Sequence, residues 1–541
     1  MSRVTPAPGR LESNRVEQAY QAGFWHDERV TDQLLRHANE RPEAVAIVDG
    51  DHRLTWADLA QRIACVRTRL SDLGLVHGDV VALQLPNWHE YTIAFHALQQ
   101  LGCVVLQLGA DWKKPEMEQG LASAPAKAIV SPAAFAGYET AQAASALMEA
   151  GSTLEHVIIV RGDAPAGCHS LDEWLSVGTS ASTDLWAQPA SPDEVVRLVF
   201  TSGTTGRPKP IMHTHNTTIH SSRTLAAAFK LSADDVLFSY VPLSTNYGAI
   251  MGLFLHALTG ATLVYMDKFS ASGTLELVER ENITFLPGTP TAFMALTNSP
   301  ALSRFNTASL KVMISAGSSF PVQAIRALRA AIPSPFIESY GMNEFGMGFW
   351  CSLDDDEEAV IGSIGRPIPG LKARVVDTNK SDVAAGETGE LIIQSAGLCA
   401  GYHGRPEANA ESWDAEGWFY TGDLASVNAT TGAYHIVGRS KEVIIRGGAN
   451  VSPREVEEAL VTDPRVREAA VIGLPDDYYG ETVCACVIAN DGESVTDAQL
   501  IDYLRERLAG YKVPTRVEFV DEFPLNAMGK VQKRVLVERF S

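Results

Sequence analysis

Hydrophobic and polar positions alternate along this chain with two different periods. Short apolar runs rich in β-branched residues predict buried strands, and these runs lie at residues 44–48, 79–85, 157–160, 195–200, 261–266 and 312–315. Apolar residues at helical spacing predict amphipathic helices, and they lie at residues 54–73, 90–101 and 322–331. Because strands and helices follow each other in turn, the pattern predicts an α/β fold of wound sheets.

The pattern changes toward the end of the chain. Residues 371–394 hold two strand-like runs around a turn rich in Gly and Asp, which predicts a β-rich subdomain. Beyond Lys441 two helices and a strand predict a compact α+β unit, at residues 453–461, 497–508 and 469–472. We therefore expect a large N-terminal domain, residues 1–439, and a small C-terminal domain, residues 440–541.

Composition limits the class of protein without selecting a chemistry. The 541 residues carry a formal net charge of -21, which argues against a nucleic-acid binder. Residues 1–18 lack the apolar core of a signal peptide, and no apolar run reaches transmembrane length. Seven scattered cysteines without metal-ligand spacing predict buried thiols in a reducing cytoplasm. Cys484 and Cys486 are expected to pack on one face of a strand.

The stretch after the strand at residues 195–200 has the composition of a phosphate-binding loop. Glycines bring backbone N–H groups close to phosphate oxygens, hydroxyls add donors, and a lysine adds a mobile charge. The residues are Thr201, Ser202, Gly203, Thr204, Thr205, Gly206 and Lys209. Their spacing is not that of a Walker A loop, and composition alone also fits an ordinary surface loop.

Four further motifs follow this loop in a fixed order. They read Ser339-Tyr340-Gly341-Met342-Asn343-Glu344, Gly417-Trp418-Phe419-Tyr420-Thr421-Gly422-Asp423, Gly438-Arg439-Ser440-Lys441-Glu442, and Asn526-Ala527-Met528-Gly529-Lys530. Together with the loop, they make the chain resemble the ANL adenylate-forming superfamily of acyl-CoA synthetases, aryl-acid ligases, peptide-synthetase adenylation domains and luciferases. The resemblance covers the chain from about Trp25 to its end.

The resemblance implies that a carboxylate attacks the α-phosphorus of ATP to give an acyl-adenylate and pyrophosphate. Both reactants are anions, so the site must neutralise and align their charges. By this resemblance the loop with Lys209 holds the β and γ phosphates, and Glu344 coordinates Mg²⁺, a hard cation that prefers oxygen ligands. Asp423 accepts hydrogen bonds from both ribose hydroxyls, and Arg439 reaches the ribose or a phosphate.

The same resemblance places other residues around the nucleotide. Those expected to flank the adenine and the phosphates are Gly317, Ser318, Ser319, Ser339, Tyr340, Gly341 and Met342. One position departs from the family pattern, because Asn343 stands where a Thr that touches the α-phosphate is usual. Asn keeps an N–H donor, so a phosphate contact remains available to it. Pro210 replaces a common Gly, which resembles the aryl-acid branch.

The C-terminal domain is expected to move between two poses. Lys530 would enter the active site and bridge carboxylate and phosphate oxygens, as the flexible ammonium of a lysine can do. Lys441 matches the family's hinge position. Gly447 and Gly448 would let the pantetheine arm of a thiol pass close to the backbone.

Substrate choice is expected to depend on the segment from Val241 to Gly248. The residues predicted to line the acid pocket are Thr245, Asn246, Tyr247, Met251, Gly317, Met342 and Met347. Asn246 could bind a carboxylate or a hydroxyl, whereas amino-acid-activating relatives usually carry an Asp here for the ammonium group. Aryl, alicyclic and fatty acids all remain candidates.

Three functions are compatible with these motifs. The first is an acid:CoA ligase that uses ATP, Mg²⁺, a small carboxylic acid and CoA. The second is a stand-alone ligase that loads a carrier protein in trans, because no carrier domain follows Ser541. The third is a nucleotide-binding regulator without catalysis, against which Lys209, Glu344 and Lys530 argue. The resemblance also leaves room for a homodimer.

Overall fold

The computed structural model describes residues 4–177, 190–200, 209–318, 320–447, 449–476, 478–490, 492–493, 495–525 and 531–541. Within these residues the strands form four sheets, called sheets I to IV below. Among the described helices, none is both long and apolar enough to cross a bilayer.

Sheet I is parallel apart from its last strand. In spatial order its strands are β7 (His169–Ser170), β6 (His156–Val160), β5 (Ala128–Pro132), β3 (Val80–Leu83), β4 (Val104–Gln107), β8 (Val195–Phe200) and the antiparallel β9 (Pro210–Thr214). The chain reverses direction between β8 and β9, which is where the phosphate-loop motif lies.

Sheet II has a parallel centre with antiparallel strands at both edges. In order its strands are β16 (Arg366–Pro367), β15 (Gly346–Trp350), β14 (Phe336–Met342), β13 (Val312–Ser315), β12 (Phe285–Gly288), β10 (Val236–Ser239), β11 (Thr262–Tyr265), β1 (Val45–Asp49) and β2 (His52–Thr55). The apolar residues of its parallel strands are buried, as they are in parallel sheets that have both faces covered by other elements.

Two smaller sheets follow in the sequence. Sheet III is antiparallel and contains β17 (Leu371–Val376), β18 (Gly389–Ser395), β19 (Phe419–Val427) and β20 (Tyr434–Arg439). Sheet IV contains β22 (Ala449–Val451), β21 (Ile444–Arg446), β24 (Gly480–Ala489), β23 (Val466–Asp476) and β25 (Arg516–Phe519).

Helices connect the strands of sheets I and II. They are α1 (Ser13–Gln21), α2 (Val30–Glu40), α3 (Trp56–Asp72), α4 (His89–Gln100), α5 (Lys114–Ser123), α6 (Thr140–Glu149), α7 (Leu171–Val177), α8 (His215–Ala228), α9 (Asn246–Ala249), the π-turn η2 (Ile250–Phe254), α10 (Leu255–Thr259), α11 (Ala271–Glu281), α12 (Pro290–Thr297), η3 (Leu302–Arg304) and α13 (Val322–Ala331). The later helices are α14 (Glu357–Val360), α15 (Pro406–Ser412), η4 (Ser440–Glu442), α16 (Pro453–Leu460), α17 (Asp497–Arg505) and α18 (Lys533–Phe540).

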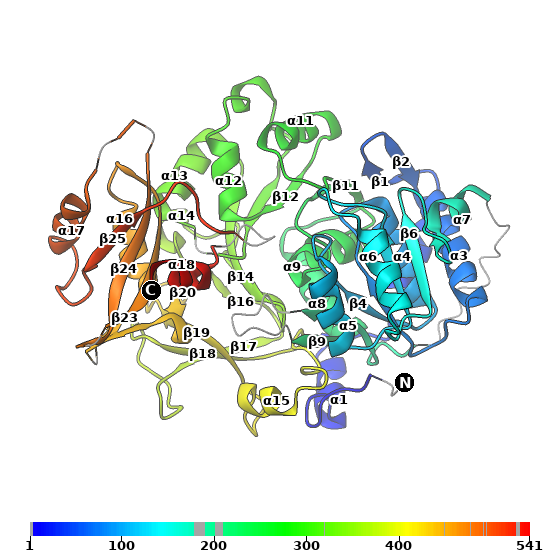
Figure 1. Ribbon diagram of the computed structural model, residues 1–541, viewed down its shortest axis with the longest axis horizontal. Helices are drawn as coiled ribbons and strands as arrows, with labels where there is room; N and C mark the ends of the chain where they lie inside the picture. The colour runs from blue at the N-terminus through cyan, green and yellow to red at the C-terminus, as the bar shows by residue number, and fades with distance from the viewer. Residues whose placement is uncertain are drawn as a thin grey trace.

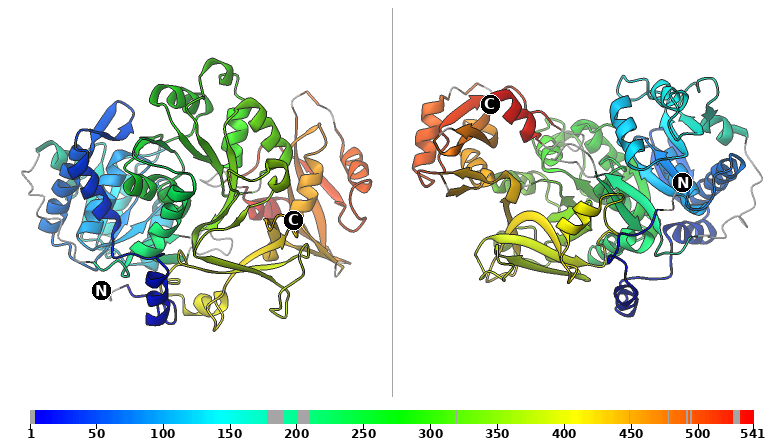
Figure 2. Two further views of the ribbon diagram at one scale, coloured as in Figure 1. Left: turned by 180° about the vertical axis from the view of Figure 1, so that it is seen from behind. Right: turned by 60° about the horizontal axis from the view of Figure 1, so that its bottom comes forward.

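The four sheets occupy different parts of the molecule. Figure 1 shows sheet I and its helices at one end, sheet IV with α16 and α17 at the other, and most strands of sheet II between them. The views of Figure 2 agree with this order and place sheet III beside sheet II. Sheets I and II share one large hydrophobic cluster, whereas sheet IV has clusters of its own. The α/β fold with a smaller C-terminal unit is as predicted.

Local details depart from the predictions in two places. Residues 54 and 55 are predicted as the start of a helix, but they end the strand β2, and the helix begins at Trp56 because Thr55 caps it. Six of the seven cysteines are buried as expected, and Cys168 is half-buried. Cys484 and Cys486 pack side by side in one core cluster, which confirms their common face.

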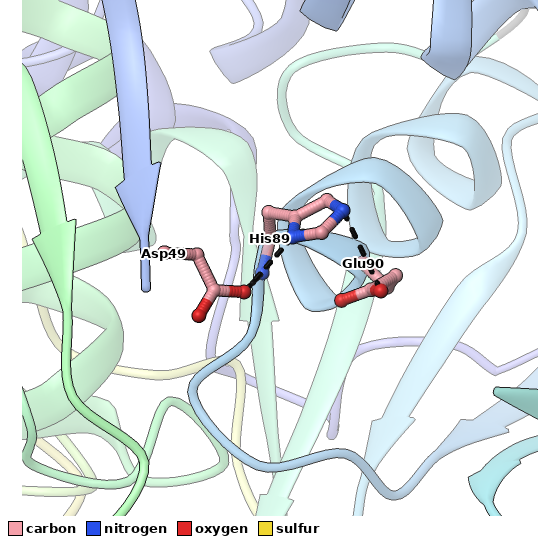
Figure 3. A group of neighbouring side chains, drawn as sticks. All are labelled: Asp49, His89 and Glu90. Atoms are coloured by element: carbon pink, nitrogen blue, oxygen red, sulfur yellow. Dashed lines mark hydrogen bonds and ion pairs between the residues drawn. The ribbon is translucent and has the colours of Figure 1, made fainter. Parts of the chain in front are cut away.

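A charged cluster joins sheet I to sheet II. Asp49, at the end of β1, accepts hydrogen bonds from the backbone N–H and from Nδ1 of His89 at the start of α4, at 3.0 and 2.8 Å. Glu90 lies beside His89 (Figure 3). Arg161, after β6, forms ion pairs with both Asp49 and Glu90 and lies over the ring of Trp88. The guanidinium therefore supplies the positive charge that these carboxylates need, and the cluster is structural.

We expect Asp49→Asn to lower the free energy of unfolding by about 3 kcal/mol at neutral pH, because it breaks a largely buried pair and leaves Arg161 partly uncompensated. Burial alone would raise the pKa of Asp49, but the hydrogen bonds from His89 and Arg161 lower it below its usual value. The stabilisation is therefore fully present above about pH 4 and is lost as the pH falls through the folded-state pKa. The difference between the two melting curves should therefore be constant from about pH 7 to about pH 4 and should shrink at lower pH, which melting curves at about pH 7, 4 and 2 measure.

The matched control is Arg534→Ala, which removes an exposed helical ion pair with Glu538 in α18. Such pairs contribute about 0–0.5 kcal/mol, so its melting curve should overlay that of the wild type. A difference between Asp49→Asn and wild type that stays constant down to about pH 2 would show that the carboxylate charge is not the source of the stability.

Candidate active site

Three segments that are far apart in the sequence meet at the carboxyl end of β8. The turn between β14 and β15 carries Asn343 and Glu344, and the Nδ2 atom of Asn343 donates to the backbone oxygen of Phe200 at 2.8 Å. The hydroxyl of Tyr402 donates to Oε1 of Glu344 at 2.9 Å. Lys209 places its Nζ atom over the ring of Tyr402, 5.1 Å from the centroid. The lysine and the carboxylate predicted for phosphate and metal are thus neighbours.

Glu344 is a buried carboxylate, 5% exposed. Burial raises its pKa above the usual value, and the hydrogen bond from Tyr402 together with the charges of Arg439 and Lys209 oppose that rise. Tyr402 uses only Oε1, so Oε2 is the oxygen that a hard cation would bind. A divalent cation would compensate the buried charge, so the donor set fits the predicted Mg²⁺.

Asp423 lies across the site from Glu344, on sheet III. It stands directly opposite Arg439 in the β19–β20 pair, and the Nε atom of Arg439 lies 2.9 Å from Oδ1. The hydroxyl of Tyr340, from β14, donates to Oδ2 at 2.5 Å. Both carboxylate oxygens of this buried residue are therefore held by protein donors, and a diol that bound here would compete with them.

Hydrogen bonds hold the side-chain amide of Asn343 in one orientation. Its Oδ1 atom accepts from the backbone N–H of Asn246 at 3.2 Å, and its Nδ2 atom donates to a carbonyl. His213 donates from Nε2 to the backbone oxygen of Asn343 at 2.8 Å, since a carbonyl can only accept. Burial and the nearby Arg197 lower the pKa of His213 to about 3, so its ring is neutral. One N–H of Asn343 remains for a phosphate oxygen.

The residues predicted for the acid pocket are mostly engaged within the protein. Asn246 is 2% exposed, and its Nδ2 atom donates to the backbone oxygen of Asn343 at 3.0 Å. The hydroxyl of Tyr247 donates to the backbone oxygen of Gly288 at 2.9 Å. Thr245 caps α9 by accepting from the backbone N–H of Gly248. Thr245 is half-buried, whereas Asn246 and Tyr247 are buried supports.

The apolar residues predicted for the acid pocket also divide into buried and half-buried positions. Met251 and Met347 belong to the hydrophobic core, whereas Met342 is half-buried at its edge. Gly317 and Ser318 are exposed after β13, and Gly317 has a φ of +97°, which favours glycine. Gly341 is tightly packed, because a Cβ there would lie 2.1 Å from the backbone oxygen of Gly346.

The remaining predicted residues are supports, exposed positions or outside the described residues. The hydroxyl of Ser339 donates to the backbone oxygen of Ser315 at 2.7 Å. Lys441 is exposed in η4, and Gly447 is exposed with a φ of +58° in the turn after β21. The predictions that fall outside the described residues concern Thr201, Ser202, Gly203, Thr204, Thr205, Gly206, Ser319, Gly448 and Lys530.

Sequence reasoning missed two residues of this site. Tyr402, which binds Glu344, lies 58 residues further along the chain, and no local pattern joins the two. Arg197 is a charged residue inside the otherwise apolar strand β8, and its side chain is fully buried. A charged residue inside an apolar strand is rare, so the sequence already indicated that Arg197 has a special role.

An α/β body with a small C-terminal unit, and with Lys209, Glu344, Asp423 and Arg439 between its sheets, defines the class of adenylate-forming enzymes. Comparison with known proteins identifies the family. The profile of the AMP-binding enzyme family matches residues 34–403, and that of the AMP-binding enzyme C-terminal domain matches residues 455–530. The chain belongs to the AMP-binding enzyme family, and it is an AMP-forming ligase that activates a carboxylic acid with ATP.

Individual relatives resemble the chain over nearly its whole length. A 3-[(3aS,4S,7aS)-7a-methyl-1,5-dioxo-octahydro-1H-inden-4-yl]propanoyl:CoA ligase of Rhodococcus jostii is 33% identical over 515 residues, which are 93% of this chain and 97% of that protein. A feruloyl-CoA synthase of an Amycolatopsis species is 33% identical over 94% of this chain and 98% of its own. The crystal structure of ATP-bound MatB from Rhodopseudomonas palustris has a TM-score of 0.85 and 29% identity, and the match covers 95% of this chain and 99% of that one.

Proposed function

We propose that this enzyme converts an aryl, alicyclic or fatty acid to its acyl-adenylate and then transfers the acyl group to the thiol of CoA, releasing AMP. The observation that carries the proposal is the buried carboxylate of Glu344, held by Tyr402 beside Lys209 and Arg439. A carboxylate in a buried, electropositive site is suited to bind a divalent cation that enters the site already bound to the triphosphate. The relatives named above, both ligases or synthases that make CoA thioesters, support CoA as the acceptor.

The described residues divide the work of the first half-reaction. Lys209 would neutralise phosphate charge, and Glu344 would hold Mg²⁺. Mg²⁺, when bound, withdraws charge from the phosphate oxygens and from the departing pyrophosphate. Asn343 donates its remaining N–H to the α-phosphate, and Asp423 exchanges its bonds with Tyr340 and Arg439 for the ribose hydroxyls.

The second half-reaction depends on the C-terminal unit. We place its start at residue 440, immediately after β20, because sheet IV has its own hydrophobic clusters and begins within a few residues of η4. In this proposal the unit turns about Lys441, withdraws Lys530 after adenylation, and presents the backbone around Gly447 to the pantetheine arm.

The class of acid follows from what surrounds the proposed pocket. The half-buried Thr245 and Met342 offer no carboxylate to an ammonium group, so an amino acid would leave its charge uncompensated. The named relatives act on an alicyclic propanoate and on an aryl acid, and both acids are largely apolar. An apolar carboxylic acid is therefore the proposed substrate.

The proposal is tested by release of AMP and pyrophosphate from ATP and Mg²⁺ across benzoate, hydroxybenzoates, ferulate, cyclohexane-carboxylate and fatty acids of graded length, each with and without CoA. We expect turnover that needs CoA and yields an acyl-CoA. Acid-dependent exchange of pyrophosphate that ignores CoA would instead favour the second candidate, a ligase for a carrier protein in trans. Light scattering in the same buffer would test the predicted homodimer.

Lys530→Ala is expected to reduce adenylation by about 100-fold, because it removes one cation from a site where two anions react. Conversion of supplied acyl-adenylate to acyl-CoA should stay within about threefold of wild type, since the proposed role of Lys530 ends with the first half-reaction. The two half-reactions are measured separately, by pyrophosphate exchange and by acyl-CoA formation. Equal losses in both would contradict this division of labour.

A further inference from the structure

A single arginine lies at the centre of the enzyme beneath the active site. Arg197 is on β8, three residues before the strand ends at Phe200, and its side chain is completely buried. Its guanidinium donates to Oγ1 of Thr218 at 2.9 Å, to Oε1 of Gln107 at 3.0 Å and to Oδ1 of Asn246. It also lies over the ring of Phe254, the last residue of the π-turn η2, 4.8 Å from the centroid.

No carboxylate of the described residues pairs with Arg197. In the described part of the chain, its hydrogen-bond partners are all neutral and it forms no ion pair. Burial lowers the pKa of Arg197 to about 9, which still leaves it charged at neutral pH. Burying an ion without a partner costs several kcal/mol. An apolar residue at this position would fit the pattern of β8 without that cost. We therefore expect the charge of Arg197 to have a function.

Arg197 determines how the Asn246 amide points. A guanidinium only donates, so it holds the Oδ1 atom of Asn246 and turns the Nδ2 atom the other way. That Nδ2 atom donates to the backbone oxygen of Asn343, and the backbone N–H of Asn246 donates to Oδ1 of Asn343. Asn343 is thus held by both donors of one residue, and that residue is held by Arg197.

We propose that Arg197 is a positioning residue for acid activation, which holds Asn343 and Glu344 through Asn246 and supplies an uncompensated positive charge beneath the point where carboxylate and α-phosphate meet. This role rests on the proposed function. The acid and the triphosphate are both anions, so a nearby cation in a low-dielectric interior favours their approach. Because Arg197 is buried behind Asn246, it acts without touching the substrate.

Three variants separate charge from hydrogen bonding. Arg197→Lys keeps the charge, Arg197→Gln keeps a donor without charge, and Arg197→Met removes both. Acid-dependent exchange of pyrophosphate with ATP gives kcat and the KM values for acid and ATP. We expect kcat to fall by about 100-fold in the Gln and Met variants and by less than about tenfold in the Lys variant, the range seen for loss of one preorganised charge or donor.

Two further measurements distinguish positioning from mere stability. The KM for ATP and the conversion of supplied acyl-adenylate to acyl-CoA should stay within about threefold of wild type in all three variants. Melting temperatures should change by a few degrees at most, because removal of an unpaired buried charge offsets the lost hydrogen bonds. Arg67→Met, in α3 and away from the site, is the matched control and should behave as wild type.

Each outcome decides the proposal. Activity of Arg197→Gln equal to wild type would overturn it, as would an Arg197→Lys variant as inactive as Arg197→Met. Losses of activity that follow the melting temperature, or that affect both half-reactions equally, would show that Arg197 has only a structural role. That result would also overturn the proposal. A wild-type chain that activates none of the acids would refute the proposed function itself, whereas an active wild type with unaffected variants refutes only the role of Arg197.

Discussion

Glu344→Gln is expected to reduce acid-dependent release of pyrophosphate by about 10³-fold at saturating ATP and Mg²⁺. Gln has nearly the same shape and can still accept the hydrogen bond from Tyr402. It lacks the negative charge that balances a divalent cation, so the loss should appear mainly in the transition state of adenylation, where metal stabilisation is worth several kcal/mol. Steady-state kinetics with a titration of Mg²⁺ measure it, and the apparent affinity for Mg²⁺ should fall.

The chain contains a matched control for this substitution. Glu338 is a second largely buried glutamate on β14, where it accepts the backbone N–H of Gly362 at 2.8 Å, and burial raises its pKa to about 7. Glu338→Gln should keep at least about half of the activity, because Gln can accept the same hydrogen bond. Equal losses in both variants, or an Mg²⁺ dependence of Glu344→Gln that matches wild type, would rule out the metal role.

Asp423→Ala is expected to lower kcat/KM for ATP by about 10²-fold. The substitution removes a buried carboxylate whose two oxygens face Tyr340 and Arg439, the groups proposed to release it to the ribose. Two hydrogen bonds to a charged group are worth about 1.5–3 kcal/mol each, which is consistent with this loss. Initial rates at varied ATP, with 2′-deoxy-ATP as a second substrate, measure the effect.

The response to 2′-deoxy-ATP makes this prediction specific. If Asp423 binds the ribose, the wild type should discriminate against the deoxy nucleotide and the Asp423→Ala variant should not. The control is Asp382→Ala, which removes an exposed ion pair with Arg374 and should change kcat/KM by less than about twofold. Undiminished discrimination in Asp423→Ala would contradict the ribose assignment.

The fold was predictable because its determinants are local. Apolar runs and helical periods located the strands β1, β3, β6, β8, β11 and β13 and the helices α3, α4 and α13 to within a few residues, with α13 and β13 at their observed bounds. The helix was predicted to begin at Leu54, two residues early, because His52–Thr55 is a short edge strand whose pairing with β1 has no local pattern of its own. Thr55, the last residue of that strand, is a typical N-cap residue, but the apolar periodicity included it in the helix.

The candidate site was predictable only in part. Motifs placed Lys209, Glu344, Asp423 and Arg439 in one site, and the structure brings them together. The same reasoning made Asn246 a substrate ligand, whereas the structure turns its amide toward Arg197 and Asn343. The orientation of an amide depends on donors and acceptors from other strands, and Arg197 lies 49 residues from Asn246.

By itself the sequence determined the family, the alternation of strands and helices, and the identity of the charged groups, since each is written in neighbouring residues or in the order of motifs. Only the tertiary structure decided that Glu344 is buried against Tyr402, that Asp423 is already paired with Tyr340 and Arg439, and that Arg197 has only neutral partners among the described residues. These properties depend on which segments the sheets bring into contact. Burial and long-range pairing change the energy of a charge by several kcal/mol, and neither can be read from the residues beside it.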